Sequence, residues 1–264
     1  MLTLKNISKT FNPKTVNEKK ALDHFNLHLD KGEFLTVIGS NGAGKSTVMN
    51  AVAGIFLIDS GHILLDGEDI TFKKDYRRAQ SIGRLFQDPL SGTAPSMSIE
   101  ENLSLAYMRT ITHISPFGLN AKERRYLRER LATLDLGLEN RLSSPVGLLS
   151  GGQRQALTLL MATLNTPKLL LLDEHTAALD PATAEKVLQL TRSIVAENHI
   201  TCVMITHNMR SSLDLGSRTI MMDSGKIILD IAGEERKNMS VNGLLERFRK
   251  AAAKDLDNDR MLLD

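Results

Sequence analysis

Residues 39–47, with the sequence Gly-Ser-Asn-Gly-Ala-Gly-Lys-Ser-Thr, carry the clearest chemical pattern of the chain. They follow an apolar segment, Phe34 to Ile38, and precede a helix-like segment, Val48 to Ala53. A glycine-rich turn between a strand and a helix lets backbone N–H groups and the helix N-terminus surround a phosphate. Lys45 adds a positive charge for the β- and γ-phosphates, and the Ser46 hydroxyl is a ligand for Mg²⁺. The predicted phosphate loop consists of Gly39, Ser40, Asn41, Gly42, Ala43, Gly44, Lys45, Ser46 and Thr47.

Two carboxylates end a second apolar segment. Leu169 to Leu172 is followed directly by Asp173 and Glu174. Ligands of open α/β folds bind where the parallel strands end, so both acids are expected at a ligand-binding edge. An acidic helix cap would explain Asp173 but would leave Glu174 without a role. The pair therefore favours metal-dependent chemistry on a phosphate.

A third motif, Leu149-Ser150-Gly151-Gly152-Gln153, lies between the other two. Its serine predicts the N-cap of a helix that begins near Gln153, and that helix N-terminus is a second place for an anion. In this order, the three motifs resemble the ATP-binding subunit of ABC transporters. The resemblance covers nearly the whole chain.

The resemblance implies a catalytic role for several single residues, with ATP and Mg²⁺ as cofactors. Asp173 and Ser46 would hold Mg²⁺, and Glu174 would polarise the water that attacks the γ-phosphate. Gln87, after the strand-like segment that ends at Phe86, would contact both the metal and that water. His207, after the apolar segment Cys202 to Ile205, would contact the γ-phosphate.

The family signature also implies a dimer. In ABC proteins it completes the site of the partner subunit, so a homodimer or a paired ATPase subunit would form two composite sites. The residues implied to act in trans are Leu149, Ser150, Gly151, Gly152 and Gln153. The loop implied to bridge the two sites contains Ala178, Leu179 and Asp180, and Ala178 stands where the family often has serine.

Two further positions have more than one interpretation. Phe11, before the polar loop Asn12 to Lys20, matches the aromatic residue that stacks on adenine, and a core residue of the first hairpin is the alternative. His175 stands where the family usually has proline. We expect altered backbone rigidity beside Glu174, and pH sensing by the imidazole is a second hypothesis.

The composition is that of an ordinary soluble globular protein: 264 residues, 42% hydrophobic and 24% charged, with a net charge of +2. This balance gives no reason to expect a nucleic-acid partner. No apolar stretch approaches the length of a membrane-spanning helix, and the N-terminus lacks the apolar core of a signal peptide. We therefore expect a cytoplasmic protein. The single cysteine, Cys202, is expected to be a buried thiol.

The expected fold class is α/β: a phosphate-loop NTPase core with a mostly parallel sheet, an N-terminal antiparallel β subdomain and an inserted helical subdomain. Residues 1–87 and 148–240 form the nucleotide-binding core, 88–147 the helical subdomain, and 241–264 a C-terminal helix and tail. Within the insert, the charged segment Asn120 to Arg130 is expected to be a solvated helix face rather than a nucleic-acid-binding helix. The expected strands are Leu2 to Ile7, Phe25 to Leu29, Phe34 to Ile38, His62 to Leu65, Ile82 to Phe86, Leu169 to Leu172 and Cys202 to Ile205, and the expected helices of the insert are Ile99 to Arg109 and Ala121 to Leu136.

The function implied by the resemblance is that of an ATPase subunit, held on the inner face of the membrane by separate permease subunits that dock near Pro89 to Asn102. The segment Glu174 to Asp180 is similar to the tryptophan or tyrosine uptake subgroup, which favours import of a small solute with a solute-binding protein in the same system. An exporter ATPase is the main alternative. A second alternative is a soluble ABC ATPase that acts in DNA repair or on the ribosome, but the chain lacks the insertions that are usual in such proteins. A third is a non-hydrolysing module that uses ATP only as a dimerisation switch, and the intact Glu174 disfavours it.

Overall fold

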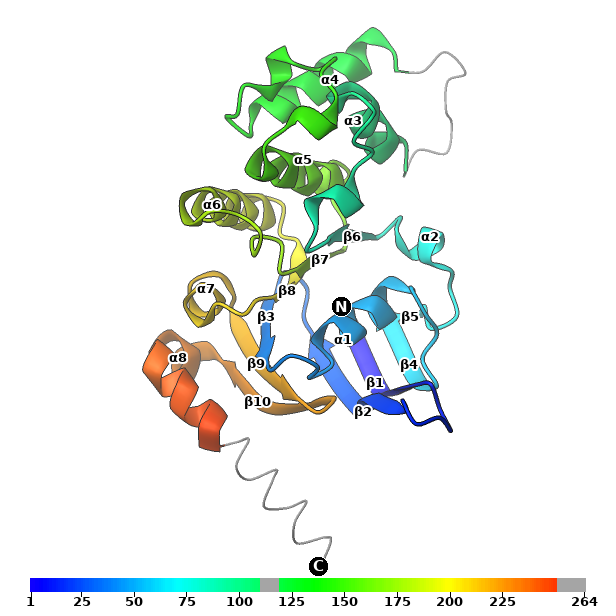
Figure 1. Cartoon of the computed structure of the whole chain (residues 1–264), viewed down its shortest axis with the longest axis vertical. Helices are drawn as coiled ribbons and strands as arrows, with labels where there is room; N and C mark the ends of the chain where they lie inside the picture. The colour runs from blue at the N-terminus through cyan, green and yellow to red at the C-terminus, as the bar shows by residue number, and fades with distance from the viewer. Residues whose placement is uncertain (110–118, 251–264) are drawn as a thin grey trace, which may run out of the picture. The chain divides into compact units, whose positions relative to one another are not determined.

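The computed structural model describes residues 1–109 and 119–250, which form two compact units (Figure 1). Among the described residues, the first unit contains 1–78 and 201–250, and the second contains 79–109 and 119–200. Residues 241–250 are helical. The rest of the expected C-terminal helix and the expected tail lie outside the described residues.

An antiparallel sheet begins the first unit, with strand order β2-β1-β4-β5. In the second half of β2, buried and exposed residues alternate, as in a strand that covers a core with one face only. This confirms the predicted N-terminal antiparallel sheet. The strands are β1 (Leu2–Phe11), β2 (Lys19–Leu29), β4 (Ser60–Leu65) and β5 (Glu68–Asp69).

The central strands of the first unit are ordered β10-β9-β3-β8. Strand β3 pairs in parallel with β8 and β9, whereas β9 and β10 form an antiparallel hairpin. All residues of β8 and all but the last of β3 are buried, as expected for parallel strands covered on both faces. Cys202 is among them, and burial raises the pKa of its thiol. The strands are β3 (Phe34–Gly39), β8 (Thr201–Ile205), β9 (Arg218–Asp223) and β10 (Lys226–Ala232).

Short helices complete the first unit. The side chains of Ile38, Met221, Ile231 and Leu244 share one buried cluster, which joins the 241–250 helix to the central strands. The helices are α1 (Lys45–Ala53), α2 (Asp75–Arg78), α7 (Met209–Leu215) and α8 (Gly233–Lys237).

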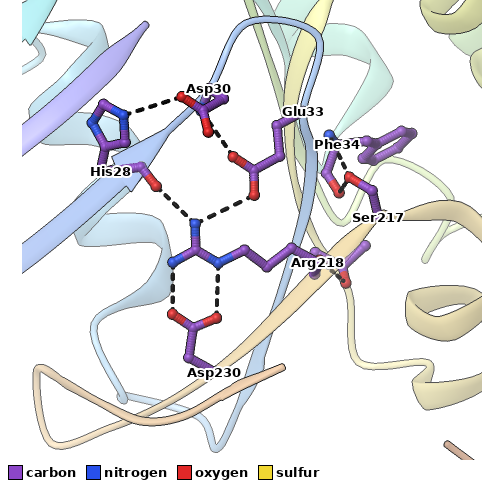
Figure 2. Close-up of polar contacts among 8 residues, drawn as sticks. His28, Asp30, Glu33, Phe34, Ser217, Arg218 and Asp230 are labelled. Atoms are coloured by element: carbon purple, nitrogen blue, oxygen red, sulfur yellow. Dashed lines mark hydrogen bonds and ion pairs between the residues drawn. The ribbon is translucent and has the colours of Figure 1, made fainter. Parts of the chain in front are cut away.

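Arg218, the first residue of β9, links the hairpin to the turn before β3 (Figure 2). Its guanidinium donates two parallel hydrogen bonds to Asp230, at 2.8 Å from Nε and 2.6 Å from Nη2. Nη1 donates to the carbonyl oxygen of His28 at 2.8 Å and to Glu33 at 3.3 Å. The pair with Asp230 raises the pKa of Arg218 further. Paired guanidinium–carboxylate bonds of this kind are among the stronger polar contacts in proteins.

The second unit combines one pair of parallel strands with helices. Strand β6 (Ile82–Leu85) pairs with β7 (Leu169–Asp173), and Leu85 lies opposite Leu172. Both strands match the sequence expectation closely. The helices are α3 (Ile99–Met108), α4 (Ala121–Ala132), α5 (Gly151–Thr163) and α6 (Pro181–Glu197), with short 3-10 turns η1 (Pro89–Gly92), η2 (Leu138–Asn140) and η3 (Val146–Leu148).

Helices α3, α4 and α5 share one buried leucine-rich cluster. Each starts with a capping box, in which the N-cap side chain and the side chain three residues later exchange bonds with the backbone. The helix expected at Ala121 to Leu136 is shorter, because Asp135 has a φ of 52° and Gly137 a φ of 67°, which a helix does not allow. The exposed charges of α4 fit the expected solvated face.

Candidate nucleotide-binding site

The predicted phosphate loop connects β3 to α1, as the pattern requires. Gly44 occupies the N-cap of α1 with a φ of 98°. A Cβ atom there would lie 2.6 Å from the carbonyl oxygen of Ala21, so both the conformation and the space require glycine. The loop is thus held tightly against β2, with its backbone close to the start of the helix.

Lys45 begins α1 and is 6% exposed. Its ammonium donates to the carbonyl oxygens of Gly39 at 2.9 Å and Ser40 at 2.8 Å, which keeps the charge inside the loop. The first turn of α1 contains no acidic residue, and its N-cap residue, Gly44, has no side chain that could cap the helix. These features give the loop a positive potential, which is the requirement for binding phosphates.

His207 lies at the same end of the central strands as the phosphate loop. Strands β3 and β8 run in parallel with Val37 opposite Ile205, and the backbone N–H of Thr206 donates to the carbonyl oxygen of Val37 at 3.2 Å. The exposed His207 follows, just before Asn208 caps α7. The structure therefore brings His207 and the phosphate loop to one edge.

Phe11 ends β1 and is half-buried. Its ring makes an edge-to-face contact with Phe56, with centroids 5.2 Å apart, and the ammonium of Lys9 lies 5.5–5.7 Å from both rings. Sequence reasoning did not single out Phe56. The sequence signal that could have identified Phe56 is its position shortly after Gly54, the C-cap residue of α1. The two rings offer an aromatic surface, while Phe11 is neither fully buried nor fully exposed.

Gln87 and the two predicted carboxylates lie at one edge of the second unit. Strands β6 and β7 are parallel neighbours, so Gln87 and Glu174 follow strand ends that lie side by side. Arg84 on β6 stacks on Phe86, with the guanidinium carbon 4.5 Å from the ring centroid. Burial lowers the pKa of Arg84, and the nearby charge of Asp173 opposes that shift. Glu174 has a φ of 45°, in the left-handed region.

The signature segment forms the start of α5. Ser150 is the N-cap: its hydroxyl accepts from the backbone N–H of Gln153 at 3.3 Å, and the Gln153 side chain accepts from the backbone N–H of Ser150 at 3.1 Å. The predicted cap is therefore present. The helix begins at Gly151, two residues before the expected start, because the capping box holds both glycines in the first turn.

The loop implied to bridge two sites packs against this signature. Asp180 caps α6 by accepting from the backbone N–H of Thr183 at 3.0 Å. Hydrogen bonds from the side chain and then the backbone of Thr183 lower the pKa of the Asp180 carboxyl. A Cβ atom at Gly152 would lie 2.0 Å from the Thr183 methyl carbon, and one at Gly151 would lie 3.1 Å from Leu179. The signature glycines thus have a packing role that the sequence motif alone did not reveal.

His175 is 2% exposed, and burial lowers the pKa of its imidazole to about 4. Its Nε2 lies 3.2 Å from the hydroxyl oxygen of Thr191 on α6. The side chain is therefore neutral near pH 7. This environment gives no support to the hypothesis that His175 senses pH near neutrality.

The residues proposed to hold a metal supply only oxygen ligands: the Ser46 hydroxyl, the Gln87 amide and the Asp173 carboxylate. Hard oxygen donors with a single carboxylate fit Mg²⁺, which keeps several waters and takes further ligands from phosphates. Within residues 1–109 and 119–250, no group of three or more His, Cys, Asp or Glu side chains could hold a metal ion. The donor set thus suits a nucleotide-associated Mg²⁺ rather than a protein-only metal cage.

A phosphate loop, a signature helix and a paired-carboxylate strand end, in an α/β fold with a helical segment, define an ATP-binding cassette. The family model described as ABC transporter matches residues 22–177, and the chain belongs to this family as an ATP-binding subunit. A solved dimeric post-hydrolysis state of an ATP-binding cassette bound to ADP and Pi is similar, with a TM-score of 0.77 and 28% identity over 88% of this chain and 98% of that one.

Two relatives of known assignment are transport ATP-binding proteins. A tyrosine transport ATP-binding protein of Clostridioides difficile is 44% identical over 95% of this chain and 100% of its own length. A methionine import ATP-binding protein of Listeria monocytogenes is 33% identical over 86% of this chain, which spans 65% of that relative. In the part of the chain that the structure describes, no helix has the length and apolar character needed to cross a membrane.

Proposed function

We propose that the chain hydrolyses ATP with Mg²⁺ and transmits the resulting conformational change to separate permease subunits. Lys45 binds the β- and γ-phosphates, and Ser46, Gln87 and Asp173 hold the metal, which neutralises phosphate charge when bound. Glu174 accepts a proton from the attacking water and so activates it. The strand-end placement of Glu174 and the buried, loop-bonded ammonium of Lys45 support these roles.

His207 and Phe11 are proposed to complete the nucleotide contacts. His207 would sense the γ-phosphate, since it shares a strand edge with the phosphate loop. Phe11 would stack on adenine, with Phe56 supporting its ring from the side. In this proposal Phe11 is a binding residue and not only part of the hairpin core.

Two chains, or this chain and a paired ATPase subunit, are proposed to form two composite sites. The signature of one subunit, from Leu149 to Gln153, would face the γ-phosphate bound by the other, and the segment from Ala178 to Asp180 would lie between the sites. The dimeric state of the similar solved cassette supports this arrangement. Closure on ATP and opening after hydrolysis would provide the mechanical step.

We further propose that the transporter is an importer of an amino acid, with tyrosine as the first candidate. The observation that carries this proposal is the 44% identity to a tyrosine transport ATP-binding protein over that relative's full length. A solute-binding protein would deliver the amino acid to the permease. The chain itself would lie on the inner face of the membrane, held there by the permease.

Proteoliposomes test this function directly. The chain is co-expressed with candidate permease and solute-binding proteins from neighbouring open reading frames, and uptake of labelled tyrosine is measured with ATP inside the vesicles. We expect ATP-dependent uptake that excess unlabelled tyrosine blocks and that Lys45→Ala abolishes. Absence of labelled tyrosine uptake, together with ATP-dependent uptake of labelled methionine or spermidine, would assign a different solute. ATP-dependent release of solute in place of uptake would assign an exporter.

A further inference from the structure

Glu174 adopts a backbone conformation that needs support from its surroundings. Its φ of 45° lies in the left-handed region, which is unfavourable for a residue with a side chain. On one side, β7 ends at Asp173. On the other side, a turn begins in which the backbone N–H of Ala177 donates to the carbonyl oxygen of Glu174 at 2.9 Å. Such conformations persist only where neighbouring contacts hold them.

The side chain that follows Glu174 supplies one of these contacts. His175 is buried, and its Nε2 lies 3.2 Å from the hydroxyl oxygen of Thr191, which is 0% exposed. The Thr191 hydroxyl donates its only proton to the carbonyl oxygen of Val187 at 2.8 Å. Thr191 must therefore be the acceptor, and Nε2 of His175 must carry the proton. This bond requires a proton on Nε2 and fixes the ring to α6.

We propose that His175 is a positioning residue for Glu174, and that its hydrogen bond to Thr191 holds the carboxylate where it activates water. The inference rests on the proposed role of Glu174 in ATP hydrolysis. Helix α6 is 17 residues long, and its buried face carries Val187, Thr191 and Val195. Through His175, this helix fixes the peptide beside the carboxylate, so loss of the bond should affect the chemical step more than nucleotide binding.

Substitutions at Thr191 test the bond without touching the histidine. Thr191→Val removes the hydroxyl at nearly constant shape, and Thr191→Ser keeps it. Thr163→Val is a matched control, because Thr163 is also buried and donates to the carbonyl oxygen of Leu159 at 2.8 Å, but on α5. Each full-length variant is assayed for single-turnover ATP hydrolysis, ATP affinity and thermal unfolding.

We expect Thr191→Val to slow single-turnover hydrolysis about tenfold while ATP affinity stays within about twofold, since a displaced catalytic group mainly affects the chemical step. Thr191→Ser and Thr163→Val should keep rates within about twofold of the parent. A parental rate in Thr191→Val, or an equal loss in Thr163→Val, would overturn the inference.

A second pair of variants covers the case in which Thr191→Val does not fold. His175→Gln keeps an N–H donor at similar reach and should retain most of the rate, whereas His175→Leu removes the donor and should lose it. Equal rates in these two variants would contradict the inference. Nitrogen-15 spectra of histidine-labelled protein should also place the proton of His175 on Nε2, and a proton on Nδ1 would contradict it.

The parallel variant Glu174→Gln separates the proposed role of Glu174 in hydrolysis from the positioning role of His175. If it hydrolyses ATP at the parental rate, the proposed role of Glu174 fails and the positioning role fails with it. If Glu174→Gln is slow while Thr191→Val is as fast as the parent, only the positioning role fails.

Discussion

A Cβ atom added to Gly152 would lie 2.0 Å from the methyl carbon of Thr183, at the point where the signature helix approaches α6. Gly152 is itself buried. The signature glycine therefore permits contact between two helices within one subunit, in addition to any contact with a nucleotide across a dimer. The two roles can be separated, because the clash involves a single methyl group.

Gly152→Ala is expected to destabilise the chain by about 1–3 kcal/mol, as overpacking of a tight contact does. Thr183→Ser removes the methyl carbon that would clash, so the double variant should recover most of this free energy of unfolding, measured by urea denaturation. If the double variant is no more stable than Gly152→Ala, then the contact with Thr183 does not explain the glycine. If the double variant regains stability but not ATPase activity, then Gly152 is also needed for contact with the nucleotide.

Lys45→Ala should weaken ATP binding at least tenfold, because it removes the ammonium held inside the phosphate loop. Equilibrium titration with a fluorescent ATP analogue measures the affinity. Lys31→Ala, which removes a lysine from an exposed turn, is the control and should bind as the parent does. Equal affinities in the two variants would show that the loop is not the nucleotide site.

Arg218→Met should lower the free energy of unfolding by about 2 kcal/mol, since the charged partners Asp230 and Glu33 and the carbonyl of His28 lose a shared donor. The control is Arg210→Met. Arg210 is exposed and forms a 3.7 Å pair with Asp214 one helical turn away, which contributes at most about 0.5 kcal/mol. Similar losses for both variants in chemical denaturation would contradict the structural role of the Arg218 contacts.

Acid should destabilise the chain partly through His175. The pKa of its imidazole falls from 6.5 to about 4 on folding, so between these pH values the unfolded chain binds a proton that the folded chain does not. The resulting stability is present above pH 6.5 and is lost as the pH falls toward 4. Between pH 7 and pH 5, the parent should lose about 2 kcal/mol more than His175→Gln. Equal losses in the two proteins would show that His175 titrates alike in the folded and unfolded states.

The sequence predicted the local elements around the site well, because each is set by neighbouring residues. A buried apolar run followed by Gly39 to Thr47 predicts a strand, a phosphate loop and a helix start, and β3 and α1 confirm the strand and the helix start. The capping serine at Ser150 was predictable for the same reason. Apolar runs before Asp173 and His207 likewise marked β7 and β8.

Long-range contacts were not predictable from the sequence. Thr183 gave no sign that it packs on Gly152, and Thr191 gave none that it binds His175, because tertiary packing brings these pairs together. The hairpin of β9 and β10 was also not singled out, although the Ser224-Gly225 turn between two apolar runs was a usable signal. Burial of His175, which decides its protonation, follows from the same packing.

ATP hydrolysis by Glu174→Gln is the decisive measurement for the role of Glu174. This change keeps the size of the side chain and removes the base, so the variant should bind ATP as tightly as the parent, accumulate as a stable dimer, and release phosphate at least about a hundredfold more slowly. Phosphate release is measured in a single turnover, with the dimer followed by light scattering on the same sample. Phosphate release near the parental rate would contradict the claim that Glu174 activates the attacking water.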